Sequence, residues 1–197
     1  GKILNCLKAD YDKIFKNEII TDLIKVIGCG VEVKTGKNKE ISMFNLDNLR
    51  WDKIVICTDA DVDGFHIRTL ILTMLYRLVP TLIEKGYVYI AESPLFEITT
   101  SDKIYFAYDE NEKTKILKMI GNKKFDIQRS KGLGENEAEM MSLTTMDPAT
   151  RRLIKIEPDD IEQTQWMFDM LLGDDLQGRK DFITNNGVDY LDMADIS

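Results

Sequence analysis

Three aspartates alternate in the segment Thr58-Asp59-Ala60-Asp61-Val62-Asp63-Gly64, and their carboxylates are the groups of this chain best suited to chemistry. An extended backbone would direct them to one side, where they repel one another unless a cation or a proton intervenes. Hard oxygen ligands suit Mg²⁺, which takes one or two protein carboxylates, keeps waters and accepts phosphate oxygens. The spacing predicts metal ligands at Asp59 and Asp61. Asp63 is either a third ligand or a cap of the following helix.

The acidic turn has other interpretations besides the metal site. A capping turn alone does not need three carboxylates within five residues. A calcium-binding EF-hand loop starts in the same way, but its twelfth position must be acidic and here is Leu70. A phosphatase with an aspartyl nucleophile, of the haloacid dehalogenase type, stays open as an enzymatic alternative. His66, the single histidine, follows the turn and has either a phosphate-contacting or a structural role.

The elements around the turn predict a strand, helix, strand unit. Residues 53–57 form a β-branched run typical of a strand buried on both faces of a parallel sheet. An apolar helix at about 65–79 stops at Pro80, and a second strand covers 87–91. Ligands bind at the carboxyl edge of such sheets, which is where the acidic turn falls.

The remaining elements complete an α/β chain. Apolar spacing predicts one amphipathic helix over 11–27, ended by Gly28, and a polar loop at 34–39. Strands are expected at 95–99, 103–108 and 125–129, and helices at 114–120, 138–143 and 161–172. We predict a Rossmann-like parallel sheet flanked by helices at 1–95, followed by a mainly helical α+β tail domain at 96–197.

Composition sets further bounds on function. Lys and Arg number 26 and Asp and Glu 34, a net charge of −8, but the segment from Glu157 onward carries eleven acidic and two basic residues and so accounts for −9. The rest of the chain is therefore nearly neutral and is compatible with a local phosphate-contacting surface. Three widely spaced cysteines favour a reducing cytoplasm over a disulfide framework. The longest apolar run is too short for a membrane span, so we expect no membrane partner.

Five ordered segments resemble the B-type subunits of bacterial type IIA DNA topoisomerases. The acidic turn and the following Phe65-His66-Ile67-Arg68 resemble the Toprim motif of that family. The other four are Gly1-Lys2-Ile3-Leu4-Asn5, Gly86-Tyr87-Val88-Tyr89-Ile90-Ala91, Gln128-Arg129-Ser130-Lys131-Gly132-Leu133-Gly134-Glu135 and Thr145-Met146-Asp147-Pro148-Ala149-Thr150-Arg151-Arg152. The matches span nearly the whole chain, and they do not separate gyrase from topoisomerase IV.

The resemblance implies a role for each matching residue. Asp59 and Asp61 match the metal-binding pair, with Asp63 third, and the ion would be Mg²⁺, with Mn²⁺ or Ca²⁺ as substitutes. Metal chemistry would support attack of a tyrosine of the A-type subunit on double-stranded DNA in an A₂B₂ complex. The positions implied to contact DNA are Lys2, Asn5, His66 and Arg179. Lys131 has a DNA or interface role or marks a tight turn, and a dinucleotide-binding loop is a weak interpretation of its Gly-rich segment.

Departures from the family are as informative as the matches. The family's catalytic glutamate lies in a Glu-Gly-Asp-Ser segment upstream of Gly-Lys-Ile-Leu-Asn, and this sequence has no such segment. We therefore expect no catalytic residue in this chain, ATP binding only in a missing amino-terminal domain of a longer parent, and no activity of the chain alone. The parent is expected in the bacterial cytoplasm, associated with the nucleoid. The alternative is a non-catalytic DNA-binding or assembly module with a Toprim scaffold.

Overall fold

The computed structural model describes residues 1–33, 41–129, 132–158 and 161–193, so the predicted loop at 34–39 lies outside the described residues. Spatial contacts divide the chain into two compact units. The first unit comprises Gly1–Ile54, His66–Val88 and Lys155–Ser197, and the second comprises Val55–Phe65 and Tyr89–Ile154. The division falls within the helix and the strands around the acidic turn.

The predicted strand, helix, strand unit is confirmed. Strand β1 (Ile54–Ile56) leads into helix α3 (Val62–Leu78), short helix α4 (Pro80–Glu84) and strand β2 (Val88–Ala91). Pro80 ends the long helix as expected, and it also begins α4, where its missing N–H costs no hydrogen bond. The two strands carry mostly buried or half-buried residues, as a strand covered on both faces requires.

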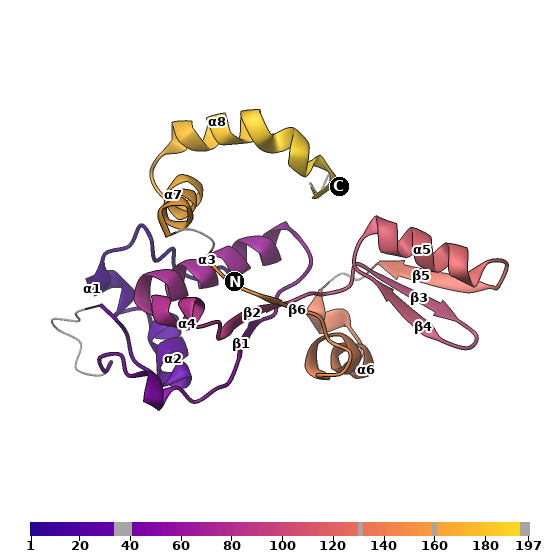
Figure 1. Cartoon of the computed structure of the whole chain (residues 1–197), viewed down its shortest axis with the longest axis horizontal. Coiled ribbons are helices and arrows are strands. Elements are labelled where there is room, and N and C mark those ends of the chain that lie inside the picture. The colour runs from indigo at the N-terminus through magenta and orange to yellow at the C-terminus, as the bar shows by residue number, and fades with distance from the viewer. Residues whose placement is uncertain (34–40, 130–131, 159–160, 194–197) are drawn as a thin grey trace. The chain divides into compact units, whose positions relative to one another are not determined.

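A third strand, β6 (Leu153–Lys155), joins this sheet, whose order is β1-β2-β6 (Figure 1). The Ile156 N–H donates to the Val88 carbonyl at 2.9 Å, and the Glu92 N–H donates to the Arg152 carbonyl at 3.1 Å. These two bonds place β6 antiparallel to β2. The sheet is therefore mixed. Strand β6 was not predicted, because it lacks the continuous β-branched run that marks β1 and is too short to show a period.

The predicted helix over 11–27 is wrong in one respect, because it is two helices. Helix α1 (Tyr11–Ile14) and helix α2 (Glu18–Ile27) are separated at Asn17, whose backbone is extended and whose Oδ1 accepts the Ile20 N–H at 3.1 Å. Asn is a preferred amino-terminal cap, so the break has a clear local cause. At the other end, Gly28 adopts a φ of 93°, the left-handed conformation that ends α2 as predicted.

In the second unit, strands β3 (Phe96–Thr100), β4 (Ile104–Ala107) and β5 (Phe125–Arg129) form an antiparallel sheet with the order β4-β3-β5 (Figure 1). Helix α5 (Glu110–Ile120) connects β4 to β5. It begins earlier than predicted because Asp109 caps it, with Oδ1 accepting the Glu112 N–H at 2.6 Å.

Arg152, the residue before β6, contacts Tyr108, the residue after β4, and Glu112 of α5, and all three residues belong to the second unit. The guanidinium of Arg152 lies 3.9 Å from the centre of the Tyr108 ring and contacts a Glu112 carboxylate oxygen at 2.7 Å. The hydrogen bond that Arg152 donates to the Glu112 carboxylate raises the pKa of Arg152 above its ordinary value. Cation–π contact and ion pairing thus join three segments that are separate in the sequence.

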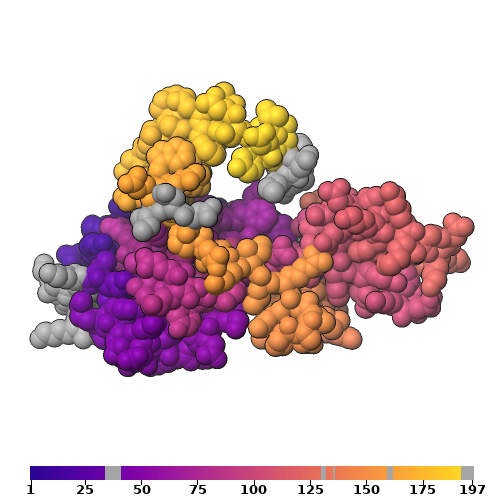
Figure 2. Space-filling view, in the orientation of Figure 1, coloured from indigo at the N-terminus to yellow at the C-terminus, as the bar shows by residue number. Residues whose placement is uncertain are grey.

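Helices dominate the remainder, as predicted for the tail. Helix α6 (Ala138–Met141) continues as a π-helical turn (Ser142–Met146), and α7 (Ile161–Leu172) has the predicted bounds. Helix α8 (Leu176–Asn186) and a final 3₁₀ segment (Gly187–Met193) were not predicted. Trp166 of α7 and Phe182 of α8 pack edge to face with ring centres 6.1 Å apart, and the two helices can be followed in orange and yellow in Figure 2. In the described part of the chain, no helix is long and apolar enough to span a membrane.

Candidate functional site

The acidic turn connects the end of β1 to the start of α3. Asp61 is the cap of α3: its Oδ1 accepts the Gly64 N–H at 2.7 Å, and its carbonyl accepts the Phe65 N–H at 2.9 Å. Asp63 is exposed and lies inside the first helical turn. The prediction that all three carboxylates alternate along an extended backbone is therefore wrong, because the chain bends at Ala60 and Asp61 and Asp63 lies in the helix. The capping role considered for Asp63 belongs to Asp61, because the helix begins one residue after it.

Asp59 is held by a segment far away in the sequence. Its half-buried carboxylate accepts the Leu133 backbone N–H through Oδ1 at 2.7 Å. A Cβ atom on Gly132 would lie 3.5 Å from Asp59 Oδ2, so the glycine backbone passes directly beside the second oxygen. Both segments belong to the second unit. The acidic turn and the Gly-Leu-Gly segment, two separate motifs in the sequence, thus meet at one carboxylate.

The start of α3 packs tightly under Asp59. A Cβ atom added to Gly64 would lie 2.1 Å from the Asp59 carbonyl oxygen, which belongs to the backbone and cannot swing away.

We expect Gly64→Ala to displace the acidic turn and to destabilise the fold by about 1–3 kcal/mol, as overpacking does. Thermal unfolding would measure this effect. Gly134→Ala is the matched control because a Cβ there meets nothing within 4 Å, and equal unfolding temperatures for the two variants would refute the expectation.

Asp59 and Asp61, the two carboxylates that precede α3, are hard oxygen donors of the kind that a divalent cation takes. Within the described part of the chain, Oδ2 of Asp59 and Oδ2 of Asp61 accept no hydrogen bond, so each residue keeps one free oxygen. The described residues include no group of three or more His, Cys, Asp or Glu side chains that could hold a metal. Mg²⁺ needs only one or two protein carboxylates and completes its shell with water and phosphate. The Thr58 hydroxyl beside the turn is buried and has no partner among these residues.

Two of the predicted DNA-binding residues hold the carboxyl end of α7. The Asn5 side-chain amide donates to the Leu172 carbonyl at 3.1 Å, and its Oδ1 accepts the Leu7 N–H at 3.0 Å. Arg179 donates from Nε to the Met170 carbonyl at 3.1 Å and from Nη2 to the Gly173 carbonyl at 2.9 Å. These bonds satisfy carbonyls that a helix end leaves without partners.

Of the other predicted DNA contacts, the structure describes Lys2 and His66. Lys2 is exposed near the amino terminus, and His66 is exposed near the start of α3. Lys131 lies outside the described residues. Beside Asn5, Lys8 forms an ion pair with Asp174 at 2.6 Å, and this hydrogen bond lowers the pKa of Asp174 below its ordinary value.

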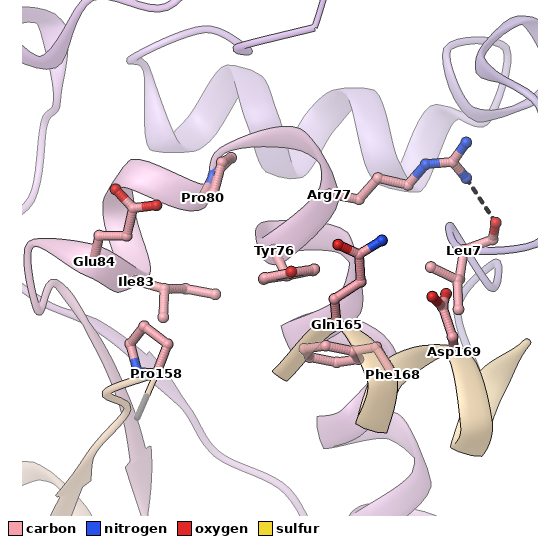
Figure 3. Close-up of a pocket in the computed structure, with 10 residues that line it drawn as sticks. All are labelled: Leu7, Tyr76, Arg77, Pro80, Ile83, Glu84, Pro158, Gln165, Phe168 and Asp169. Carbon is pink, nitrogen blue, oxygen red and sulfur yellow. Dashed lines mark hydrogen bonds between the residues drawn. The ribbon is translucent and has the colours of Figure 1, made fainter. Parts of the chain in front are cut away.

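A separate pocket of about 400 Å³ lies in the first unit (Figure 3). Tyr76 of α3 and Phe168 of α7 stack there with ring centres 4.8 Å apart. The pocket wall is largely apolar, and Arg77 at its rim donates to the Leu7 carbonyl at 3.0 Å, as the dashed line in Figure 3 marks. None of the three aspartates of the acidic turn lines this pocket, so it is not the metal site.

The group that positions Asp59, the Leu133 backbone N–H, was not predicted from the sequence. Every residue except proline has a backbone N–H, so residue type does not show which N–H acts as a donor to a particular side chain. The only signal was the pair of glycines at 132 and 134, since glycine permits a close backbone approach. That pair is equally typical of a tight turn and of an interface, so it did not single out the contact.

Comparison with known proteins shows which families and which proteins this chain is similar to. Residues 1–93 match the Toprim domain family, and residues 122–184 match the family described as DNA gyrase B subunit, carboxyl terminus. The DNA gyrase B subunit of Mycoplasmoides gallisepticum is 43% identical over 186 residues, which are 94% of this chain and 27% of that protein. That of Thermotoga maritima is 40% identical over 188 residues, 95% and 28% respectively. That of Clostridium acetobutylicum is 42% identical over 195 residues, 98% and 29%.

The sheet, the acidic turn and the first match define a Toprim domain. With the carboxyl-terminal match and the relatives, the chain is similar over nearly its whole length to one part of the DNA gyrase B subunit. It spans less than a third of the length of these relatives.

Proposed function

We propose that this chain forms the metal-binding part of an ATP-dependent type IIA DNA topoisomerase. In the proposed assembly, two B-type subunits and two A-type subunits form an A₂B₂ complex on double-stranded DNA. The observation that carries the proposal is the pair Asp59 and Asp61, each held by a backbone N–H through one oxygen and, among the described residues, left with the other oxygen free. Catalytic carboxylate and ATP-binding groups would belong to other parts of the parent protein.

Asp59 and Asp61 would hold Mg²⁺, or Mn²⁺ or Ca²⁺ in its place, and Asp63 is a weaker third candidate. Such an ion supplies charge stabilisation at a phosphodiester and at the departing oxygen. The residues of this chain keep the two carboxylates fixed, so that little reorganisation is needed when the ion and DNA bind. Rigid placement of this kind is what makes electrostatic stabilisation effective.

Lys2, Asn5, His66 and Arg179 are the proposed DNA contacts, with Lys131 as a further candidate. Lys2 and His66 are exposed and could reach a phosphate directly. Asn5 and Arg179 would have to give up their bonds to α7 to do the same. We infer that these two act first as anchors of α7.

We retain the division at residues 1–95 and 96–197 as a proposed domain boundary, which the two family matches at 1–93 and 122–184 support. We also propose that the parent protein works in the cytoplasm with the bacterial nucleoid, where its DNA substrate lies.

The test is cleavage of supercoiled DNA by the intact B-type protein reconstituted with its A-type partner. We expect double-strand breaks covalently linked to the A-type subunit with Mg²⁺, and none with a chelator. This chain alone should neither cleave nor relax DNA. Cleavage that persists in chelator would contradict the metal-dependent mechanism.

A non-catalytic DNA-binding or assembly module is the second candidate. This function predicts salt-sensitive duplex binding that survives chelation, without cleavage by the complex. The same assay therefore separates the two candidates.

A further inference from the structure

We propose that the backbone N–H of Leu133 is a positioning group for the metal-binding carboxylate of Asp59. The inference rests on the proposed function, because it takes Asp59 as a metal ligand. It adds that the Gly132-Leu133 backbone fixes which oxygen of that carboxylate meets the ion. The N–H touches neither metal nor DNA and acts through Asp59.

The first support is the local structure of Asp59. It lies in irregular backbone between β1 and α3, where neither a strand ladder nor a helix restricts its side chain. A carboxylate in such a segment would otherwise rotate among several rotamers. The 2.7 Å bond from the Leu133 N–H to Oδ1 is charge-assisted, which makes it short and strong enough to select one orientation.

The second support is the clearance around the other oxygen. Gly132 has no side chain, and even a Cβ atom there would lie 3.5 Å from Oδ2 and 3.8 Å from Cγ. A longer side chain at residue 132 would therefore crowd the carboxylate. Gly132 has φ −97° and ψ 154°, which any residue can adopt, so its backbone conformation does not require glycine. A Cβ atom at this position would make ordinary van der Waals contact with Asp59, so only a side chain that extends further toward Oδ2 would disturb the carboxylate.

The consequence is a dependence of metal affinity on a segment 74 residues away in the sequence. Loss of a group that orients a metal ligand commonly lowers metal affinity by about 10- to 100-fold. A merely structural bond would instead change the stability of the segment that begins at Leu133 and leave metal affinity unchanged.

The experiment compares Leu133→Pro with Leu133→Ala in the intact B-type protein. Proline lacks the N–H, and the extended conformation of Gly132 is the one that a residue before proline prefers. Alanine removes the leucine side chain but keeps the N–H, so it is the matched control. The readout is Mn²⁺ binding without DNA, followed by the electron paramagnetic resonance signal of the free ion, with thermal unfolding measured in parallel.

We expect Leu133→Pro to raise the Mn²⁺ dissociation constant about 10-fold or more, and Leu133→Ala to change it less than about threefold. Wild-type affinity in a folded Leu133→Pro variant would overturn the inference, as would equal losses in both variants. If Leu133→Pro fails to fold, Gly132→Val decides. Its larger side chain should weaken Mn²⁺ binding by crowding Oδ2, and wild-type binding in that variant would overturn the inference.

Asp59→Asn separates this inference from the proposed function. If Asp59→Asn binds Mn²⁺ as tightly as the wild type, the proposed metal site itself is wrong. If Asp59→Asn binds weakly while Leu133→Pro binds normally, the metal site stands and only the positioning role fails.

Discussion

Asp59→Asn and Asp61→Asn are each expected to lower Mg²⁺-dependent DNA cleavage by the intact complex at least about 100-fold. Each change removes one negative charge and replaces a hard oxygen ligand with an amide, while the shape of the side chain is kept. ATP hydrolysis should remain largely intact, because the ATP-binding domain is expected elsewhere in the parent protein. Gel assays of linear DNA formation and a coupled ATPase assay would measure the two activities.

Asp61→Asn is an unusually clean test because Asp61 also caps α3. Asn and Asp are nearly equal as amino-terminal caps, so the bond to the Gly64 N–H should survive the change. The loss of cleavage can then be assigned to the metal ligand rather than to helix stability. Asp61→Ala, which removes both functions, should in addition destabilise the protein by about 1 kcal/mol.

Asp63→Asn is the control for charge in the same segment. Asp63 is exposed in the first turn of α3, whereas Asp59 and Asp61 precede the helix. We therefore expect a smaller loss of cleavage than for either of the other two residues. Equal losses at all three positions would argue for a general charge effect, and unchanged cleavage in Asp59→Asn would remove that residue from the metal site.

Arg77→Met is expected to destabilise the protein by about 2–4 kcal/mol, since buried carbonyls that lose a charged donor are costly. Arg77 donates from Nη1 to the carbonyls of Cys6, of Leu7 at 3.0 Å and of Ala9 at 2.7 Å. Its guanidinium also lies 4.6 Å from the centre of the Tyr11 ring. One side chain thus anchors the amino-terminal segment that carries Lys2 and Asn5.

Thiol labelling at Cys6 gives a local readout of this anchor. Cys6 is fully buried, and burial raises its pKa to about 11, although the charge of Arg77 acts in the opposite direction. The wild-type thiol should therefore react slowly with alkylating reagents at pH 8, because little thiolate is present. In Arg77→Met we expect faster labelling as the segment opens to solvent, measured by mass spectrometry of the Cys6 peptide.

Lys180→Met is the matched control for the loss of a cation. Lys180 is exposed on α8, so the change should leave both the unfolding temperature and Cys6 labelling near the wild type. An Arg77→Met variant that unfolds and labels like Lys180→Met would show that the anchor contributes little. Arg77→Lys should rescue only in part, since an ammonium group lacks the planar fork of the guanidinium.

The sequence by itself determined the class of fold and the location of the acidic turn. The β-branched run before Asp59 and the apolar helix before Pro80 are local patterns, and the structure confirms them as β1 and α3. Helix α7 and strand β5 also have the predicted bounds. Local patterns succeed where long periodic or β-branched runs dominate, because propensity and burial then agree.

Some errors were local, and the sequence contained the information to avoid them. Asn17 before Glu18 is an amino-terminal cap signal that splits the predicted first helix, and Asp109 likewise starts α5 earlier. Apolar spacing continues across Asn17, so periodicity alone does not show the break between the two helices. The role of Asp61 belongs to the same group, since an aspartate just before a helix is the usual cap.

Only the tertiary structure decided which groups meet. The Leu133 N–H reaches Asp59 across 74 residues, and Asn5 reaches the Leu172 carbonyl across 167. Both contacts involve backbone atoms, which every residue carries and no residue type signals. The resemblance implies a DNA contact at Arg179, and in the structure its guanidinium donates to carbonyls at the end of α7. The sequence determines the chemistry of each side chain, but the tertiary fold determines which group that side chain contacts.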